Sequence, residues 1–196
     1  MGNKKSSPNS DSDSDSEKVW ILRLDKNTGK MKKVSYDKPN LRPQPVPSEY
    51  FDQKSQKWTK CKGEVRPIKD VKQLKLLTYN LLLSKFKFEQ RIAYFWKIVQ
   101  ESDPDFICFQ EFTEVYWNAL KESAWAKNYY VSVVPIQKHF TIMLSKYPVQ
   151  FYLTEFISHQ GRYILFAESS INAEKTAVMC VHLESRFHDY DYRTHQ

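Results

Sequence analysis

Glycine is scarce in this sequence, which contains only four glycines among 196 residues. They lie far apart and cannot build a glycine-rich loop around a phosphate, so the P-loop and the dinucleotide-binding motif are excluded. Long apolar runs are also missing, because none reaches the roughly 20 residues that cross a bilayer. No apolar stretch of a secretory signal follows the first residues. We therefore expect neither a nucleotide-binding loop nor a membrane-spanning helix.

The cysteines are too few and too far apart for a disulfide framework or a structural zinc site. The sequence has three, Cys61, Cys108 and Cys180, and no Cys-x-x-Cys pair. Two of them stand inside apolar, strand-like runs, DFICFQ and VMCVH. This usage is typical of a reduced, intracellular protein. We expect a location in the nucleus, the cytoplasm or both.

Positive charge is concentrated in one segment of the chain. The net charge is +7, and residues 21–70 carry thirteen Lys and Arg against six Asp and Glu. Residues 71–196 are nearly neutral, with fourteen basic and thirteen acidic residues. A basic segment favours a polyanionic partner such as nucleic acid. A solvated basic linker explains the same composition, and the sequence leaves both interpretations open.

Residues 1–18 form an acidic, serine-rich tail composed mostly of Ser, Asp, Asn and Lys. Such a segment cannot offset the cost of ordering its backbone, so we expect it to be disordered. Gly2 fits the acceptor position for N-myristoylation once Met1 is removed. A single acyl chain binds membranes only marginally, and the acidic run opposes a second, basic signal. Any membrane association would therefore depend on Gly2.

Residues 19–70 have the pattern of a basic accessory extension with hairpins. Two apolar-rich runs, 19–25 and 31–37, flank a Lys-Asn-Thr-Gly-Lys segment that suits a hairpin loop. A second short hairpin is expected between EYFD and KWTK. The four prolines between the hairpins impose extended, non-helical backbone.

From Leu74 onward the pattern becomes that of a packed α/β domain. QLKLLTYNLLL predicts a strand buried on both faces, and DFICFQE predicts another. Between them, apolar residues of FEQRIAYFWKIVQES recur at helical spacing, and Pro104 ends the helix. A second helix is predicted to begin after a cap at Thr113. Short strands with close turns follow over 129–182, which indicates antiparallel pairing and hence a mixed sheet.

Polar residues follow three of the apolar strands at their carboxyl ends: Asn80, Glu111 and His182. Ligand sites of open α/β sheets lie at that edge. A carboxylate beside an amide suits Mg²⁺, which keeps waters and phosphate oxygens as its remaining ligands. An imidazole beside them could donate to a phosphate oxygen in the transition state. Taken singly, these residues are better explained as a turn asparagine, a solvated glutamate and a partly buried histidine; it is their combination that suggests a site.

Four short motifs carry a resemblance to a known family. They are TYN at Thr78–Asn80, QE at Gln110–Glu111, FTIML at Phe140–Leu144 and HLES at His182–Ser185. With these motifs, residues 74–196 resemble the endonuclease/exonuclease/phosphatase superfamily, and within it the type 2 tyrosyl-DNA phosphodiesterases. Arg193 matches an arginine that opens the next helix in that family, which implies a role in binding the substrate.

The resemblance implies a truncated four-layer α/β/β/α sandwich of the deoxyribonuclease I type with mixed sheets. Residues 71–196 would then be the N-terminal part of a catalytic domain. The implied activity is Mg²⁺- or Mn²⁺-dependent phosphodiester hydrolysis in DNA repair, by a monomer acting on DNA that carries a 5′-phosphotyrosyl end.

The resemblance also assigns roles to individual residues. Glu111 is implied to bind the metal, and Asn80 to position metal-bound water and the phosphate. His182 and Ser185 are implied to stabilise the transition state as catalytic residues. Arg162 resembles the arginine that opens a central strand of the second sheet, where it would either face the phosphate or support the structure.

One departure from the family pattern keeps alternatives open. No Asp-x-Asn motif follows His182, although family members carry their water-activating carboxylate there and a second histidine later. We interpret the chain as the N-terminal portion of the enzyme. The alternatives are another phosphodiesterase of the superfamily, acting on RNA or on a phospholipid or inositol phosphate, and a catalytically dead polyanion-binding module. In that module the aromatic residues of the basic segment would stack on bases: Trp20, Tyr36, Tyr50 and Trp58.

Overall fold

The structure is a computed structural model that describes residues 18–25, 27–37, 41–62, 65–84, 86–134, 140–156, 158 and 161–183. The chain divides into two compact units, Met1–Asn40 and Leu41–Gln196. The domain boundary expected at residue 71 does not coincide with this division, because strands from residues 41–70 pair with strands of the later segment. The expected tail, up to residue 17 and including Gly2, lies outside the described residues.

The described part of the first unit is the predicted hairpin. Strands β1 (Lys18–Asp25) and β2 (Lys30–Asp37) pair antiparallel, with Asp25 opposite Lys30. The Asp25 carboxylate accepts hydrogen bonds from the backbone N–H groups of Asn27 and Thr28. Gly29 closes the turn with a positive φ of 66°, a conformation that glycine adopts without the steric penalty of a Cβ.

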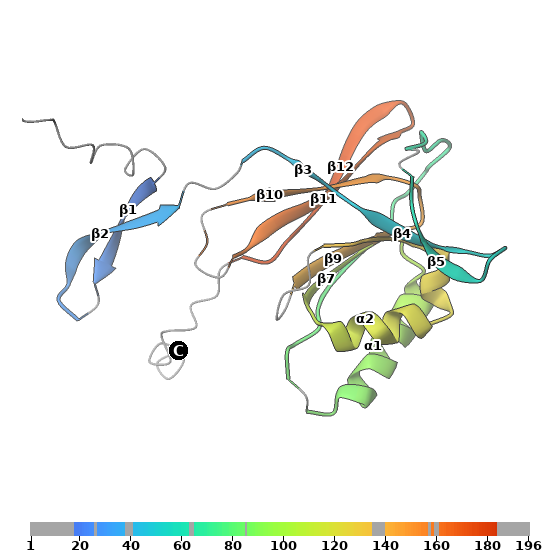
Figure 1. Cartoon of the computed structure of the whole chain (residues 1–196), viewed down its shortest axis with the longest axis horizontal. Helices are drawn as coiled ribbons and strands as arrows, with labels where there is room; N and C mark the ends of the chain where they lie inside the picture. The colour runs from blue at the N-terminus through green and yellow to red at the C-terminus, as the bar shows by residue number, and fades with distance from the viewer. Residues whose placement is uncertain are drawn as a thin grey trace, which may run out of the picture. The chain divides into compact units, whose positions relative to one another are not determined.

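A mixed six-stranded sheet forms the centre of the second unit (Figure 1). Its strands, in spatial order, are β5 (Lys57–Lys60), β4 (Ser48–Asp52), β8 (Tyr130–Ser132), β9 (Phe140–Ser145), β7 (Phe106–Phe112) and β6 (Leu76–Asn80). β6 and β7 are parallel, and the other pairs are antiparallel. The parallel pair and the β4–β5 hairpin agree with the sequence patterns.

The second sheet of this unit has four antiparallel strands. In spatial order they are β12 (Glu174–Val181), β11 (Tyr163–Ile171), β10 (Gln150–Glu155) and β3 (Gln44–Val46). β3 lies at the end of the order and contains Pro45, which has no N–H to donate and is therefore suited to a strand at the edge. The proline-rich segment is thus extended as predicted, and it pairs with the domain.

The helices cover the face of the six-stranded sheet that is turned away from the four-stranded sheet (Figure 1). α1 (Phe88–Ser102) packs Phe95 on Tyr79 and Trp96 on Phe109, with ring centroids 4.3 and 6.0 Å apart. α2 (Glu114–Glu122) and the short 3₁₀ helix η1 (Trp125–Asn128) complete this layer. None of the described helices is long and apolar enough to cross a membrane.

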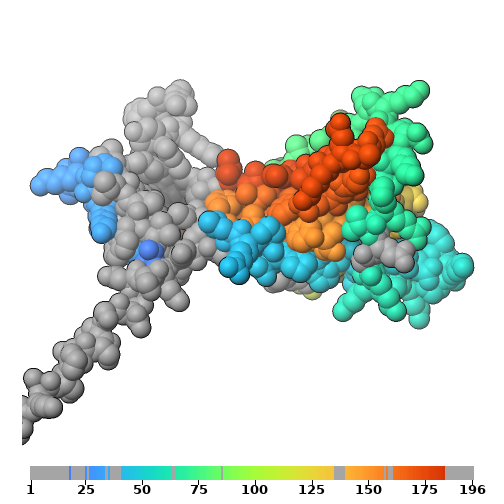
Figure 2. All heavy atoms as spheres, turned by 90° about the horizontal axis from the view of Figure 1, so that it is seen from above, coloured from blue at the N-terminus to red at the C-terminus, as the bar shows by residue number. Residues whose placement is uncertain are grey.

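The arrangement is the predicted mixed α/β sandwich, with a helical layer and two sheets. Figure 2 shows β10, β11 and β12, coloured orange to red, on the surface of the second unit. Among the described residues no helix covers that face of the four-stranded sheet. The described chain therefore holds the α/β/β layers of the expected four-layer fold.

Local patterns predicted α1 well. Three of its apolar residues, Ile92, Phe95 and Val99, are buried, as their spacing predicts. The helix ends at Ser102, and Asp103 caps it with a positive φ of 43° and an N–H that donates to the Val99 carbonyl. Pro104 follows and cannot continue the helix.

Strand β6 differs from the prediction. It was expected to be buried on both faces, but most of its residues are exposed, including Leu76 and Tyr79. Among the described strands it pairs only with β7, so one side and part of one face stay open. β12 is likewise the end strand of its sheet, and it exposes Met179 and Val181. Both sheets thus end in strands with apolar side chains at the surface.

Candidate functional site

A β-bulge turns Glu111 out of the regular strand pattern. In the β7–β9 ladder, Phe109 pairs with Ile142 and Phe112 with Phe140, so Gln110 and Glu111 together face a single residue. Glu111 has a positive φ of 55°, a conformation that costs a non-glycine residue of order 1 kcal/mol or more. Bulges of this kind re-aim side chains and occur often beside functional sites.

The carboxylate of Glu111 is held at the carboxyl ends of the parallel strands β6 and β7. Asn80 donates from Nδ2 to Oε1 at 2.9 Å, and the backbone N–H of Leu83 donates to Oε2 at 2.9 Å. Asn80 is itself fixed, because its Oδ1 accepts the Leu82 N–H at 2.9 Å. The Glu111 side chain keeps 15% exposure, so its remaining lone pairs are open to a ligand.

His182 reaches the same place from the other sheet. It follows β12, and its Nε2 lies 3.8 Å from Oε1 of Glu111. Its Nδ1 lies 2.7 Å from Nη1 of Arg162, the residue that precedes β11. The predicted convergence of Asn80, Glu111 and His182 is confirmed. The expectation of a single sheet edge is wrong, since β12 pairs with β11 in the four-stranded sheet and faces β7 across the sandwich.

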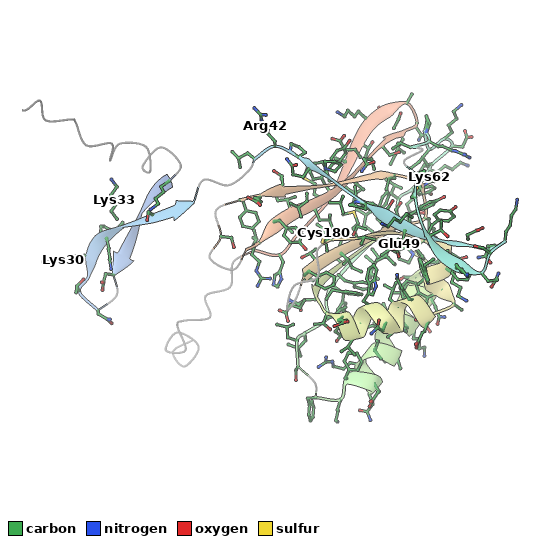
Figure 3. All side chains as sticks on the ribbon, viewed as in Figure 1. Lys30, Lys33, Arg42, Glu49, Lys62 and Cys180 are labelled. Carbon is green, nitrogen blue, oxygen red and sulfur yellow. The ribbon has the colours of Figure 1, made fainter. Side chains whose placement is uncertain are left out.

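Gln110, which precedes Glu111 in β7, forms hydrogen bonds to side chains of β6 and β12. It is buried, and its Nε2 donates to Oγ1 of Thr78 at 3.0 Å and to Sγ of Cys180 at 3.2 Å. Cys180 lies between the two sheets (Figure 3). Its thiol is hydrogen-bonded to Cys108, and that bond together with burial raises the pKa of the Cys108 thiol. The connection links β6, β7 and β12 where their polar ends meet.

Arg91 fixes the segment that follows β6, and sequence reasoning did not find it. Its guanidinium on α1 donates to four backbone carbonyls and to the Tyr116 hydroxyl. The carbonyls are those of Leu81, Leu82, Ser84 and Phe86. The Tyr116 hydroxyl in turn donates to the Leu81 carbonyl at 2.8 Å. Nothing in the sequence distinguishes this arginine from one on a solvated helix face.

Tyr163 satisfies the backbone that the bulge leaves unpaired, a role that sequence reasoning also missed. Its hydroxyl accepts the N–H of Thr141 at 3.0 Å and donates to the Thr141 carbonyl at 3.1 Å. Burial raises the pKa of Tyr163 to about 12. Thr141, the residue opposite the bulge, is therefore hydrogen-bonded to Tyr163 of the four-stranded sheet rather than to β7.

The cluster offers a metal ion one carboxylate. Among the described residues, no group of three or more His, Cys, Asp or Glu side chains could hold a metal ion. Mg²⁺ does not require such a group, because it is often bound through one or two carboxylates with waters and substrate phosphates. Glu111, whose Oε1 accepts a hydrogen bond from Asn80 and whose Oε2 accepts one from the Leu83 N–H, fits an ion held in that way.

The other residues with predicted roles either lie outside the described residues or make other contacts. Ser185 and Arg193 lie outside the described residues, as do the side chains of Trp20 and Tyr36. Trp58, proposed for base stacking, donates to the Lys121 carbonyl at 3.1 Å and packs edge-on against Phe51. Tyr50 packs against Tyr130 with a centroid distance of 5.7 Å. Both rings pack against other aromatic side chains of the protein, which weakens the case for the base stacking expected of them.

Solved structures with a similar fold share the arrangement of sheets and helices. D. rerio TDP2 crystallised with a single-strand DNA product has a TM-score of 0.53 and 21% identity, over 62% of this chain and 50% of that chain. D. rerio TDP2 humanized by 14 mutations has a TM-score of 0.52 and 20% identity, over 62% and 51%. TDP2 from C. elegans has a TM-score of 0.50 and 19% identity, over 59% and 37%.

This chain thus spans 37 to 51% of the length of these structures. Comparison with curated proteins finds no match. The sequence profile of the Endonuclease/Exonuclease/phosphatase family matches residues 77–196, which include Asn80, Glu111 and His182. These residues make up more than half of the chain, and the fold they adopt is the one expected of that family. The chain belongs to the Endonuclease/Exonuclease/phosphatase family.

Proposed function

We propose that this chain is the N-terminal portion of a metal-dependent phosphodiesterase that acts on 5′-tyrosyl-DNA adducts in DNA repair. The observation that carries the proposal is the convergence of Asn80, Glu111 and His182 from three strands of two sheets. Family membership supports hydrolysis of a phosphodiester. The fold shared with TDP2 structures, one of them crystallised with a single-strand DNA product, supports nucleic acid as the substrate.

Each residue of the cluster has a distinct role in this proposal. Glu111 binds Mg²⁺ or Mn²⁺, and Asn80 orients that carboxylate through its 2.9 Å hydrogen bond. His182 presents Nε2 on the side of Glu111 and donates a hydrogen bond to a non-bridging phosphate oxygen as charge develops there. Arg162 holds the imidazole from its other side. Ser185 and Arg193 follow His182 in the sequence and are proposed to contact the same phosphate.

A bound divalent ion would polarise the phosphate and lower the pKa of a coordinated water. The described residues of the cluster would hold the ion and orient the phosphate, and none of them has the role of activating the water. Each carboxylate oxygen of Glu111 accepts one hydrogen bond, Oε1 from Asn80 and Oε2 from the Leu83 N–H. The lone pairs that remain suit this carboxylate to binding a cation.

The test replaces Glu111 by Gln, which keeps the shape of the side chain and removes its charge. Mn²⁺ binding to the protein, followed by electron paramagnetic resonance, should be lost in Glu111→Gln and retained in Glu101→Gln, whose carboxylate is exposed on α1. Metal-dependent release of tyrosine from a 5′-phosphotyrosyl oligonucleotide should follow the same pattern. Equal Mn²⁺ binding by Glu111→Gln and the unaltered protein would contradict the proposal.

Substrate choice separates the alternatives. Metal-dependent cleavage of RNA or of an inositol phosphate, without action on the tyrosyl oligonucleotide, would favour another phosphodiesterase of the family. Binding of polyanions that is unchanged in Glu111→Gln, with no metal binding, would favour the catalytically dead module. The Mn²⁺ measurement therefore distinguishes an enzyme site from a binding surface even where turnover is slow.

A further inference from the structure

The segment between β6 and α1 exposes apolar side chains beside the candidate site. Leu82, Leu83 and Phe86 are all exposed, and the Phe86 side chain most of all, at 71%. The segment adjoins the site, since the N–H of Leu83 donates to Glu111. Apolar groups that stay exposed beside a functional site often mark a binding surface.

Hydrogen bonds hold the described backbone of this segment at Leu82, Ser84 and Phe86. The Arg91 guanidinium donates to the carbonyls of Leu82, Ser84 and Phe86 at 3.1, 2.8 and 3.0 Å. The N–H of Phe86 donates to Oγ of Ser84 at 3.1 Å. The backbone at Phe86 is therefore anchored at both its N–H and its carbonyl, and the exposed ring is carried by a fixed support.

The ammonium group of Lys87 lies near the exposed ring of Phe86. Nζ of Lys87 lies 5.4 Å from the centroid of Phe86, within the distance of a cation–π interaction. Lys87 is itself exposed and caps the start of α1 with a positive φ of 49°. An aromatic face with a basic side chain beside it is the combination with which proteins bind single-stranded nucleic acid, because the ring stacks on a base and the cation faces the backbone.

Phe86 lies close to Glu111 because it closely follows Leu83, whose N–H contacts that carboxylate. Phe86 is three positions after Leu83, so their Cα atoms are at most about 11 Å apart. A nucleotide adjoining a phosphate at Glu111 can therefore reach the Phe86 ring.

We propose that Phe86 and Lys87 form a subsite for single-stranded nucleic acid, with Phe86 stacking on an unpaired base and Lys87 facing a phosphate. That the reacting phosphate lies at Glu111 follows from the proposed function. The stacking surface is inferred independently, from the exposure of the Phe86 ring and the hydrogen bonds that hold its backbone. The subsite assigns a substrate class to the site: a strand whose end is unpaired, rather than a phosphate ester without a base.

The test measures fluorescence anisotropy of a dye-labelled single-stranded oligodeoxynucleotide, with EDTA present so that no cleavage occurs. An abasic strand with the same number of phosphates serves as the second probe. Phe86→Ala should weaken binding of the first strand by about 5- to 140-fold, the effect of losing about 1 to 3 kcal/mol of stacking. Binding of the abasic strand should not change, and Phe86→Trp should restore binding of the first strand.

Matched controls come from α1. Tyr94→Ala removes an aromatic ring of similar exposure and should leave both affinities unchanged. Lys87→Ala should weaken binding of both strands and reduce the slope of log K against log salt by about 1, whereas Lys97→Ala should not. Far-UV circular dichroism of each variant checks that the fold is intact.

Three results would contradict the subsite. The first is that Phe86→Ala and Tyr94→Ala bind the single-stranded oligodeoxynucleotide equally well. The others are that Phe86→Ala weakens binding of the abasic strand by the same factor, and that the unaltered protein binds neither strand. Failure of the proposed function gives a different pattern, because these measurements exclude metal. Loss of Mn²⁺ binding in Glu111→Gln with no effect of Phe86→Ala would keep the function and reject the subsite. The reverse result would keep the subsite and reject the function.

Discussion

Nη1 of Arg162 lies 2.7 Å from Nδ1 of His182. The guanidinium has only donors, so Nδ1 must be the acceptor and the proton of the neutral imidazole lies on Nε2. Nε2 faces Oε1 of Glu111 at 3.8 Å. The contact thus selects the tautomer that presents an N–H to the candidate site.

Removal of the Arg162 guanidinium should abolish the preference of His182 for this tautomer. In ¹⁵N–¹H correlation spectra of the ring nitrogens, His182 should show a protonated Nε2 and an unprotonated Nδ1. Arg162→Gln should give a mixture of both tautomers and lower phosphodiester cleavage by roughly 10- to 100-fold, as for other partners that orient a site residue. Arg42→Gln, at an exposed position, is the control. An unchanged His182 spectrum in Arg162→Gln would refute the assignment.

Arg91→Ala should destabilise the protein strongly. The substitution removes the guanidinium that donates to four backbone carbonyls, and each carbonyl loses that hydrogen bond. We expect the free energy of unfolding in urea to fall by about 3 kcal/mol, since hydrogen bonds to a charged group contribute about 1.5 to 3 kcal/mol. Arg91→Lys should recover only part of this, because an ammonium lacks the planar fork. Lys97→Ala, on the exposed face of α1, should change stability by less than about 0.5 kcal/mol. Arg91→Ala and Lys97→Ala proteins of equal stability would contradict the role of Arg91.

Tyr163 should make stability depend on alkaline pH. Its pKa is raised to about 12 by burial, and in the unfolded chain it is about 10. The folded protein therefore holds the phenolic proton more tightly. The corresponding stability is fully present below about pH 10 and is lost as pH rises toward 12.

Tyr163→Phe tests both roles of the hydroxyl. At neutral pH the variant should be less stable by about 1 to 3 kcal/mol, because the N–H and the carbonyl of Thr141 lose their partner. Between pH 10 and 12 its stability should fall less steeply than that of the unaltered protein. Tyr152→Phe, which changes a half-buried ring stacked on Phe166, provides the comparison in the same urea titrations. If the alkaline slopes of all three proteins are equal, another group accounts for the dependence.

The open edge of β12 should promote self-association. Met179 and Val181 are exposed on this strand, Met179 at 66%, and no described strand pairs with its outer side. Unpaired, apolar edge strands are templates for pairing with another chain. Sedimentation velocity should show concentration-dependent association that Met179→Lys reduces. Met31→Lys, at an exposed position of the first unit, should not reduce it. A monodisperse monomer at every concentration would contradict this expectation.

Several elements of the fold could be predicted from the sequence because their signals are local. The apolar spacing within residues 88–102 records one buried helix face, and α1 has those bounds. Alternation and turn residues likewise predicted the hairpins and the strands after Tyr129. The candidate site was found because Asn80, Glu111 and His182 each follow an apolar run, a signal that short windows contain.

Local sequence patterns indicated the helices and strands and the three candidate residues, whereas long-range contacts set how these residues meet. Which sheet contains β12, and therefore that His182 faces Glu111 across the sandwich, depends on pairing between residues far apart in the chain. The bulge at Glu111 and the contacts of Arg91 arise from the fit of neighbouring elements. Periodicity reports whether a side chain is buried, whereas its partner is set by the packing of the whole fold.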